Sequence, residues 1–249
     1  MLTNEKTREI LVITEGEEKE PRLMEQLISI YELTGNFNIT PYKTNIYILY
    51  YSMFDGQDPD IIDIRTHLRE REKDESIKAA LGKRFAETIL IFDFEPQDAR
   101  FSEEKIRRMM EFFNDSSDRG KLYINYPKAE AFEHMKSIPD AEYNTRTVPR
   151  DMLFRKQYKR LAKSESCIKY NEDLGTFEID RCKCSIIIKQ NIDKAWHITG
   201  HMGDALVPPD AVSILNEQLQ KLKDEQVIAI LCTCVFYIAE YDKKLLHNS

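Results

Sequence analysis

Three short apolar runs, each followed by a stretch with helical spacing, constrain the fold of this 249-residue chain most strongly. The runs cover residues 10–14 (ILVIT), 88–94 (TILIFDF) and 120–127 (GKLYINYP). In the first two, aliphatic and β-branched residues follow one another without polar alternation, which is typical of strands covered on both faces, and the third is a strand closed by Pro127. Strands of this kind that alternate with helices predict an α/β fold, Rossmann-like, with a parallel central sheet flanked by helices.

The alternation of strands and helices ends near residue 138. We therefore predict an α/β domain over residues 1–138 and a mainly helical C-terminal part, packed on it, over residues 139–249. In the first part we also expect a strand over 38–42 and helices over 21–31, 58–81, 103–113 and 129–138. In the second part we expect helices over 149–163 and after residue 210, and a short strand at 184–190 (CSIIIKQ).

Acidic residues gather where two of these strands end. Glu15 follows the first strand, and Asp93 and Glu95 end the strand at 88–94. Ligands of open parallel sheets bind beyond the carboxyl ends of the strands, and residues two apart in extended backbone point the same way. Clustered carboxylates repel one another unless a cation lies among them, and their oxygens suit Mg²⁺ or Mn²⁺. We expect a metal site here; solvated surface acids without a role are the alternative.

The order of these motifs resembles the topoisomerase–primase (Toprim) domain over residues 8–135. The stretch TEGEEKEP, residues 14–21, is similar to the RloB-like branch and, more distantly, to the nuclease halves of overcoming-lysogenization-defect proteins. A third piece, NYPKAEAF at residues 125–132, resembles an Asn-Pro with a downstream Glu that follows the acidic strand in RloB-like chains. The resemblance implies a Toprim-like sheet and a metal-dependent nuclease.

The resemblance also implies roles for single residues. Glu15 matches a glutamate that works as general acid/base or as a metal contact, and Asp93 and Glu95 match the catalytic, metal-binding pair. The family carries Asp-x-Asp, so Glu95 departs from the pattern by one methylene. Further metal candidates are Glu18 or Glu20, which would support a second ion, and more weakly Asp98 and Glu130.

The chemistry implied is hydrolysis of phosphodiester bonds in DNA or RNA with Mg²⁺ or Mn²⁺ as cofactor. By resemblance alone we expect a role in bacterial antiviral defence beside an ABC- or SMC-like ATPase. The sequence has no phosphate-binding loop of the Gly-x₄-Gly-Lys type, so any nucleotide-driven motor would be another protein. A homo-oligomer is also compatible with the sequence. Two alternatives stay open. One is a non-catalytic Toprim-like module that binds nucleic acid or a partner ATPase, and the other is a phosphatase or phosphotransfer enzyme for small molecules.

The segment 146–163 (RTVPRDMLFRKQYKRLAK) reverses the acidic character of the chain, with seven basic residues against one acid. The net charge of −7 and a pI of about 5.4 argue against broad binding of duplex nucleic acid, but not against a local basic groove. We expect a nucleic-acid contact here, with phosphates held by basic side chains and bases stacked on Phe154 and Tyr158. Its basic candidates are Arg155, Lys156, Lys159 and Arg160. A solvated helix face is the alternative.

Cysteine and histidine pairs give weaker signals. Cys182/Cys184 and Cys232/Cys234 lack the usual zinc spacing, and we expect buried structural thiols, the second pair on a helix. His197 and His201 are expected at the surface or at a helix cap. The longest apolar run near the C-terminus, residues 227–239, is too short to span a bilayer, and the polar N-terminus lacks a signal-peptide core. We therefore expect a cytoplasmic protein that does not bind membranes.

Overall fold

A computed structural model describes residues 8–55 and 63–247 of the chain. Its centre is a five-stranded sheet with the strand order β2-β1-β3-β5-β4. The strands are β1 (Glu9–Thr14), β2 (Asn36–Pro41), β3 (Glu87–Asp93), β4 (Asn114–Asp115) and β5 (Gly120–Asn125). All neighbouring pairs are parallel except the short β4, which is antiparallel to β5. The predicted α/β fold with a parallel central sheet is confirmed.

The register of the sheet brings the carboxyl ends of the central strands to one edge. Thr14 at the end of β1 lies beside Ile91, and Asp93 at the end of β3 lies beside Asn125 of β5. Every residue of β3 is buried, as the unbroken apolar run of this strand predicts. Residues that follow β1, β3 and β5 are therefore neighbours in space.

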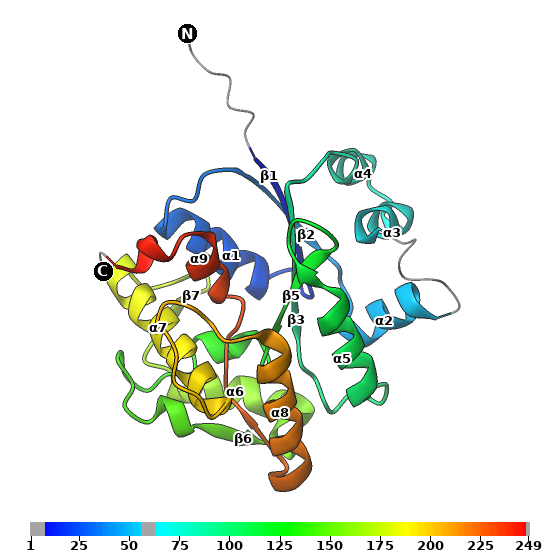
Figure 1. The fold of residues 1–249 in the computed structure, drawn as a ribbon. Helices are drawn as coiled ribbons and strands as arrows, with labels where there is room; N and C mark the ends of the chain where they lie inside the picture. The colour runs from blue at the N-terminus through cyan, green and yellow to red at the C-terminus, as the bar shows by residue number, and fades with distance from the viewer. Residues whose placement is uncertain (1–7, 56–62, 248–249) are drawn as a thin grey trace.

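Helices cover both faces of the sheet (Figure 1). In the view shown, α1 (Lys19–Ile30) and α9 (Phe236–Tyr241) lie on one side, and α2 (Ile46–Phe54), α5 (Glu103–Phe112), α3 (Ile64–Arg71) and α4 (Glu75–Leu81) lie on the other. Asn45, Asp74 and Ser102 cap α2, α4 and α5 by accepting backbone N–H bonds. The predicted helix over 58–81 is two helices, and its residues 58–62 lie outside the described ones.

The C-terminal part is mainly helical and packs on the sheet, with α5 against α8. Its elements are β6 (Thr147–Pro149), α6 (Gln157–Glu165), β7 (Tyr170–Asn171), β8 (Thr176–Phe177), α7 (Arg181–Ile198), α8 (Ala211–Glu225) and β9 (Val227–Ala229), with 3₁₀ turns at Ala129–Phe132, Tyr143–Thr145, Arg150–Lys156 and Lys243–Leu246. A bridge between Tyr126 and Leu231 joins the two parts, and one hydrophobic core runs through both. The boundary at residue 138 stays a prediction.

The strand expected at residues 184–190 is wrong, because this run lies inside α7. Asp180 caps the helix by accepting a bond from the Lys183 N–H at 2.8 Å. Buried side chains follow at helical spacing, as Cys184, Ile187, Ile188 and Ile192 do. A short apolar run cannot by itself distinguish a buried strand from a buried helix.

The helix expected over 129–138 is also wrong beyond its first turn. Only Ala129–Phe132 form a 3₁₀ turn, and the chain then continues without regular structure. Glu133 is buried and accepts a 2.5 Å bond from Lys19 of α1, and Arg146 donates to the His134 carbonyl. Tertiary contacts of this kind override local helix propensity.

The thiol prediction is confirmed in part. Cys184, Cys232 and Cys234 are buried, whereas Cys182 is exposed. Cys232 and Cys234 lie between β9 and α9, so the helix expected there is wrong for this pair, and their sulfur atoms are 3.4 Å apart. His197 and His201 are exposed, as predicted. Among the described residues, no helix combines the length and apolarity required to cross a bilayer.

Candidate metal centre beside a basic cleft

Three carboxylates meet at the carboxyl edge of the sheet. Glu15 follows β1 directly, and its backbone N–H donates to the Ile91 carbonyl at 2.9 Å, which continues the pairing with β3. Asp93 is the last residue of β3, and its backbone N–H donates to Glu15 Oε2 at 3.1 Å. Glu15, Asp93 and Glu95 each offer an oxygen, and these oxygens all lie within 4.8 Å of one another. The predicted convergence of these three acids is confirmed.

Glu95 reaches the cluster by a different route from the one expected. The expectation that the backbone stays extended from Asp93 to Glu95 is wrong, because β3 ends at Asp93 and Glu95 has φ +40°. Phe94 between them is fully buried, and its carbonyl accepts a 2.5 Å bond from the Tyr47 hydroxyl. A non-glycine residue in this region costs about 1–3 kcal/mol and persists only where its surroundings impose it. The buried Phe94 and its hydrogen bonds therefore turn Glu95 back over the strand end.

Lys128 places an ammonium group among the three acids. It forms an ion pair with Glu95, and its Nζ lies 3.8 Å from Asp93 Oδ2. The backbone N–H of the next residue, Ala129, donates to Asp93 Oδ1 at 2.9 Å. Burial opposes the charge on Lys128, but Asp93 and Glu95 outweigh it and raise the pKa of the ammonium. The cluster thus already holds one positive charge.

The raised pKa values of the acids show that ionising all of them together is costly. Burial, followed by repulsion from Glu95, raises the pKa of Glu15 to about 8. Burial, followed by the charge of Glu15, holds the pKa of Asp93 well above its usual range. One ammonium does not offset three neighbouring carboxylates, so an added cation is favoured here.

The acids after Glu15 line the cleft but do not join the cluster of three. Glu18 is exposed at the start of α1, whereas Glu20 is buried, and burial raises the pKa of Glu20. A Cβ at Gly16 would lie 2.8 Å from Glu20 Oε2, so glycine gives this carboxylate room behind Glu15. Glu130 also lines the cleft, and its Oε1 lies 3.5 Å from Lys19 Nζ and 3.8 Å from Lys159 Nζ.

Asp98 is not brought to the cluster. Its carboxylate pairs with Arg100 at 2.9 Å and accepts a 2.7 Å bond from Asn45. Although its burial acts in the opposite direction, Arg100 and Asn45 hold the pKa of Asp98 below its usual range. It does not line the cleft either, so the structure gives no support to Asp98 as a metal ligand.

The acids and the basic segment line one open cleft of about 650 Å³. Its lining combines Asp93 and Glu95 with Arg155, Lys156 and Lys159, which come from the turn Arg150–Lys156 and from α6. In the sequence these two groups lie some sixty residues apart. The fold thus brings carboxylates that can hold a cation into the same cleft as side chains that can hold phosphates.

The basic segment differs from the single helix expected. Arg155 and Lys156 have φ +54° and +62°, and this break separates the 3₁₀ turn from α6. Tyr158 is 1% exposed and packs on His134, so the expectation that it stacks on a base is wrong. Arg160 is exposed on α6 but does not line the cleft.

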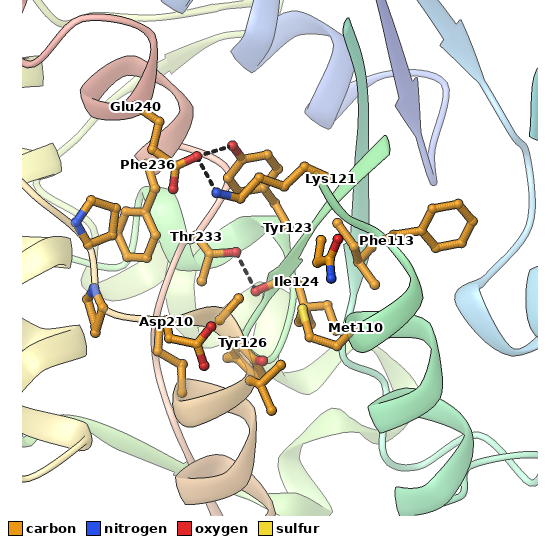
Figure 2. Close-up of a pocket in the computed structure, with 17 residues that line it drawn as sticks. Met110, Phe113, Lys121, Tyr123, Ile124, Tyr126, Asp210, Thr233, Phe236 and Glu240 are labelled. Atoms are coloured by element: carbon orange, nitrogen blue, oxygen red, sulfur yellow. Dashed lines mark hydrogen bonds and ion pairs between the residues drawn. The ribbon is translucent and has the colours of Figure 1, made fainter. Parts of the chain in front are cut away.

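A smaller cavity of about 170 Å³ lies between β5, α5, α8 and α9 (Figure 2). Its charged groups have partners, since Glu240 accepts 2.6 Å bonds from both Lys121 and Tyr123, and Asp210 accepts a 2.8 Å bond from the Ser213 N–H at the start of α8. The Thr233 hydroxyl donates to the Ile124 carbonyl at 2.8 Å. Within the described residues the buried Tyr126 hydroxyl beside it has no hydrogen-bond partner. This cavity gathers no set of acids or bases suited to catalysis.

Sequence reasoning overlooked Lys128 although a signal for it exists. The third parallel strand ends at Asn125, and Lys128 follows three residues later at the edge where Asp93 ends. The rule that placed the acids beyond the strand ends applies to this lysine as well. Lys128 was not predicted because only acidic residues were considered at this edge.

Comparisons with known proteins do not identify the chain. No family model matches it, and neither the curated proteins nor the solved structures contain a match.

Proposed function

We propose that this protein is a divalent-metal-dependent nuclease that hydrolyses phosphodiester bonds of DNA or RNA. The observation that carries the proposal is the shared cleft, whose lining combines Asp93 and Glu95 with Lys156 and Lys159, and Glu15 completes the acid cluster with Asp93 and Glu95. A phosphodiester needs both features, because its backbone charge must be held while a hard cation contacts the reacting phosphate. The resemblance to Toprim nucleases agrees with this chemistry.

The donor set fits Mg²⁺ or Mn²⁺. All three groups are carboxylates, the hard ligands that these ions take. Two oxygens on one Mg²⁺ are at most about 4.2 Å apart, and the oxygens here lie within 4.8 Å of one another, so small side-chain rotations suffice. When bound, the ion would polarise a phosphoryl oxygen and activate water.

The residues of the chain then divide the remaining work. Where Asp93 and Glu95 hold the ion, Glu15 beside them would accept and return a proton of the attacking water. Lys128, beside Glu95, would stabilise negative charge that develops on the reacting phosphate. Lys156 and Lys159, which line the same cleft, would orient the nucleic-acid backbone. A partner ATPase stays a prediction from the resemblance.

One observation favours the non-catalytic alternative. Lys128 is paired with Glu95 and lies close to Asp93, so an internal ammonium already offsets part of the charge that a metal would neutralise. A module that binds nucleic acid without cutting it would keep the basic residues of the cleft and need no metal. The two functions differ in one measurable outcome, which is cleavage.

A cleavage assay with end-labelled single- and double-stranded DNA and RNA tests the proposal. We expect cleavage with Mg²⁺ or Mn²⁺, none with EDTA, and a loss of at least about 100-fold in Glu15→Gln and Asp93→Asn. Glu9→Gln is the matched control, because Glu9 lies at the opposite edge of the sheet, bonded to Asn36 and Asn38. Equal cleavage by wild type and Asp93→Asn would assign the activity to a contaminant and refute the proposal.

A further inference from the structure

The rim of the cleft exposes an aromatic ring next to its basic residues. Phe154 is 50% exposed and lines the cleft together with Arg155 and Lys156. By contrast Tyr158, four residues later, is buried in the core. A single exposed apolar ring is ordinary on a protein surface, but this one lines the cleft of the acid cluster beside two cations, where a bound nucleic acid could reach it.

The backbone holds this ring outward at a cost. Phe154 is extended, with ψ 149°, and the two residues after it are left-handed although neither is glycine. A continuous helix would avoid this strain, because Arg155 and Lys156 would then take ordinary dihedrals. Strain of this kind is retained chiefly at ligand-binding and catalytic positions.

The exposed ring selects among forms of nucleic acid. In a duplex the bases are stacked and paired, so an aromatic side chain at a rim finds no free base face unless a nucleotide is flipped out. In a single strand every base offers a face, and a few basic residues suffice to hold the backbone. An acidic chain with a small local group of basic residues fits the second case.

The cleft also continues beyond the acid cluster. A second groove of about 800 Å³ shares Glu18, Lys19 and Lys159 with it and runs past Lys163 and Tyr170. A site for a single nucleotide would need no such extension. Two adjoining grooves suit a polymer that extends beyond the acid cluster.

We infer that the cleft takes a single strand of DNA or RNA, with one base stacked on Phe154 and the neighbouring phosphates beside Lys156 and Lys159. The inference rests on the proposed function in placing the reacting phosphate at Glu15 and Asp93. It adds that the substrate is single-stranded and that Phe154 contacts one of its bases.

Fluorescence anisotropy with labelled oligonucleotides of about 12 residues tests the inference. The probes are oligothymidylate, oligouridylate and a blunt DNA hairpin, and Mg²⁺ is present in a Glu15→Gln background so that nothing is cut. The first two probes distinguish DNA from RNA. We expect at least one of the two single-stranded probes to bind at least about tenfold more tightly than the hairpin. Thymidine monophosphate at equal concentration should not displace the bound single strand.

Phe154→Ala in that background should weaken single-strand binding about tenfold or more, and Phe154→Tyr should retain it. Tyr51→Ala is the matched control, because Tyr51 is also an exposed aromatic residue but lies on α2 outside the cleft. Hairpin binding as tight as single-strand binding, displacement by the mononucleotide, or unchanged affinity in Phe154→Ala would overturn the inference.

These outcomes separate the two proposals. Phe154-dependent binding of single strands by a protein that cuts nothing supports the inference and refutes the nuclease. Metal-dependent cleavage confined to duplexes supports the nuclease and refutes the inference.

Discussion

The two edges of the central sheet both carry acidic side chains, but the partners that balance the charge of these acids differ between the edges. At the amino edge each acid has partners of its own, since Glu9 accepts 2.8 Å bonds from Asn36 and Asn38, and Glu87 pairs with Arg8. At the carboxyl edge three acids converge around the single ammonium of Lys128.

The consequence appears in the pKa values. Hydrogen bonds from Asn36 and Asn38 lower the pKa of Glu9, whereas burial and Glu95 raise the pKa of Glu15 to about 8. Acids at a strand end therefore do not by themselves indicate a metal site. A site is indicated where acids outnumber the cations that the fold supplies.

The largest difference between the edges should appear in cleavage. We expect Glu15→Gln to lower the cleavage rate by about 10²–10⁴-fold, because it removes a proton acceptor. Glu9→Gln should stay within about twofold of wild type, since the amide at residue 9 lies far from the substrate. Single-turnover rates with Mg²⁺ measure both. Equal losses in the two variants would show that the edges do not differ in the way proposed.

The stabilisation of the folded protein by metal should depend on the acids of the carboxyl edge and not on those of the amino edge. At a metal concentration 100 times Kd the free energy of unfolding rises by about 2.7 kcal/mol, which raises Tm by about 5–10 °C in a chain of this length. We expect this shift in wild type and Glu9→Gln, and its loss in Asp93→Asn. Differential scanning fluorimetry with Mg²⁺ and with EDTA measures it.

The variant Lys128→Met tests whether the ammonium group of Lys128 competes with metal in the same Tm measurement. Removing the ammonium leaves the three acids without this counter-charge, so the metal-free protein should lose stability and the metal-induced rise in Tm should exceed that of wild type. A smaller rise would mean that Lys128 supports metal binding rather than offsetting charge in its place.

The pH dependence of stability should have opposite signs at the two edges. The pKa of Glu15 is about 8 in the folded state and 4.5 in an ordinary environment. Between pH 4.5 and pH 8 this carboxyl group is therefore protonated in the folded state and ionised in the unfolded state. Its contribution to the free energy of unfolding is full below pH 4.5 and is lost as pH rises through 8.

For Glu9 the lowered pKa gives a contribution that is present above pH 4.5 and lost as pH falls. Urea unfolding from pH 4 to pH 9 in EDTA, with Glu15→Gln subtracted from wild type, isolates the first contribution. A difference that does not change with pH would contradict the raised pKa.

The smallest effect is expected at Asp98, which lies beyond the same strand but has Arg100 as its partner. Asp98→Asn should leave metal affinity unchanged and cost at most about 1 kcal/mol of stability, as for other partly exposed ion pairs. Calorimetric titration with Mn²⁺ provides the check. A clear loss of affinity would bring Asp98 into the metal site after all.

Much of the fold could be predicted because β1 and β3 contain unbroken apolar runs and helical patterns follow β1, β3 and β5. The carboxyl-edge acids followed from parallel topology, which fixes where a strand must deliver its next residue. The run at 184–190 failed because a buried helix and a buried strand share this composition.

The details of the site depend on tertiary contacts that local pattern does not encode. Glu95 turns back because Phe94 is buried, and the basic helix breaks at Arg155 and Lys156, which are good helix formers. Such departures from local propensity are expected at functional sites, where strain is retained for placement of side chains.

Direct binding of Mn²⁺ is the most immediate test of a cation site at the carboxyl edge. Free Mn²⁺ gives a strong electron paramagnetic resonance signal at room temperature that fades on binding, so a titration counts bound ions in wild type, Asp93→Asn and Glu9→Gln. We expect binding at micromolar to millimolar Mn²⁺ in wild type and Glu9→Gln, and its loss in Asp93→Asn. A titration curve that is the same for wild type and Asp93→Asn would contradict a metal centre formed by Glu15, Asp93 and Glu95.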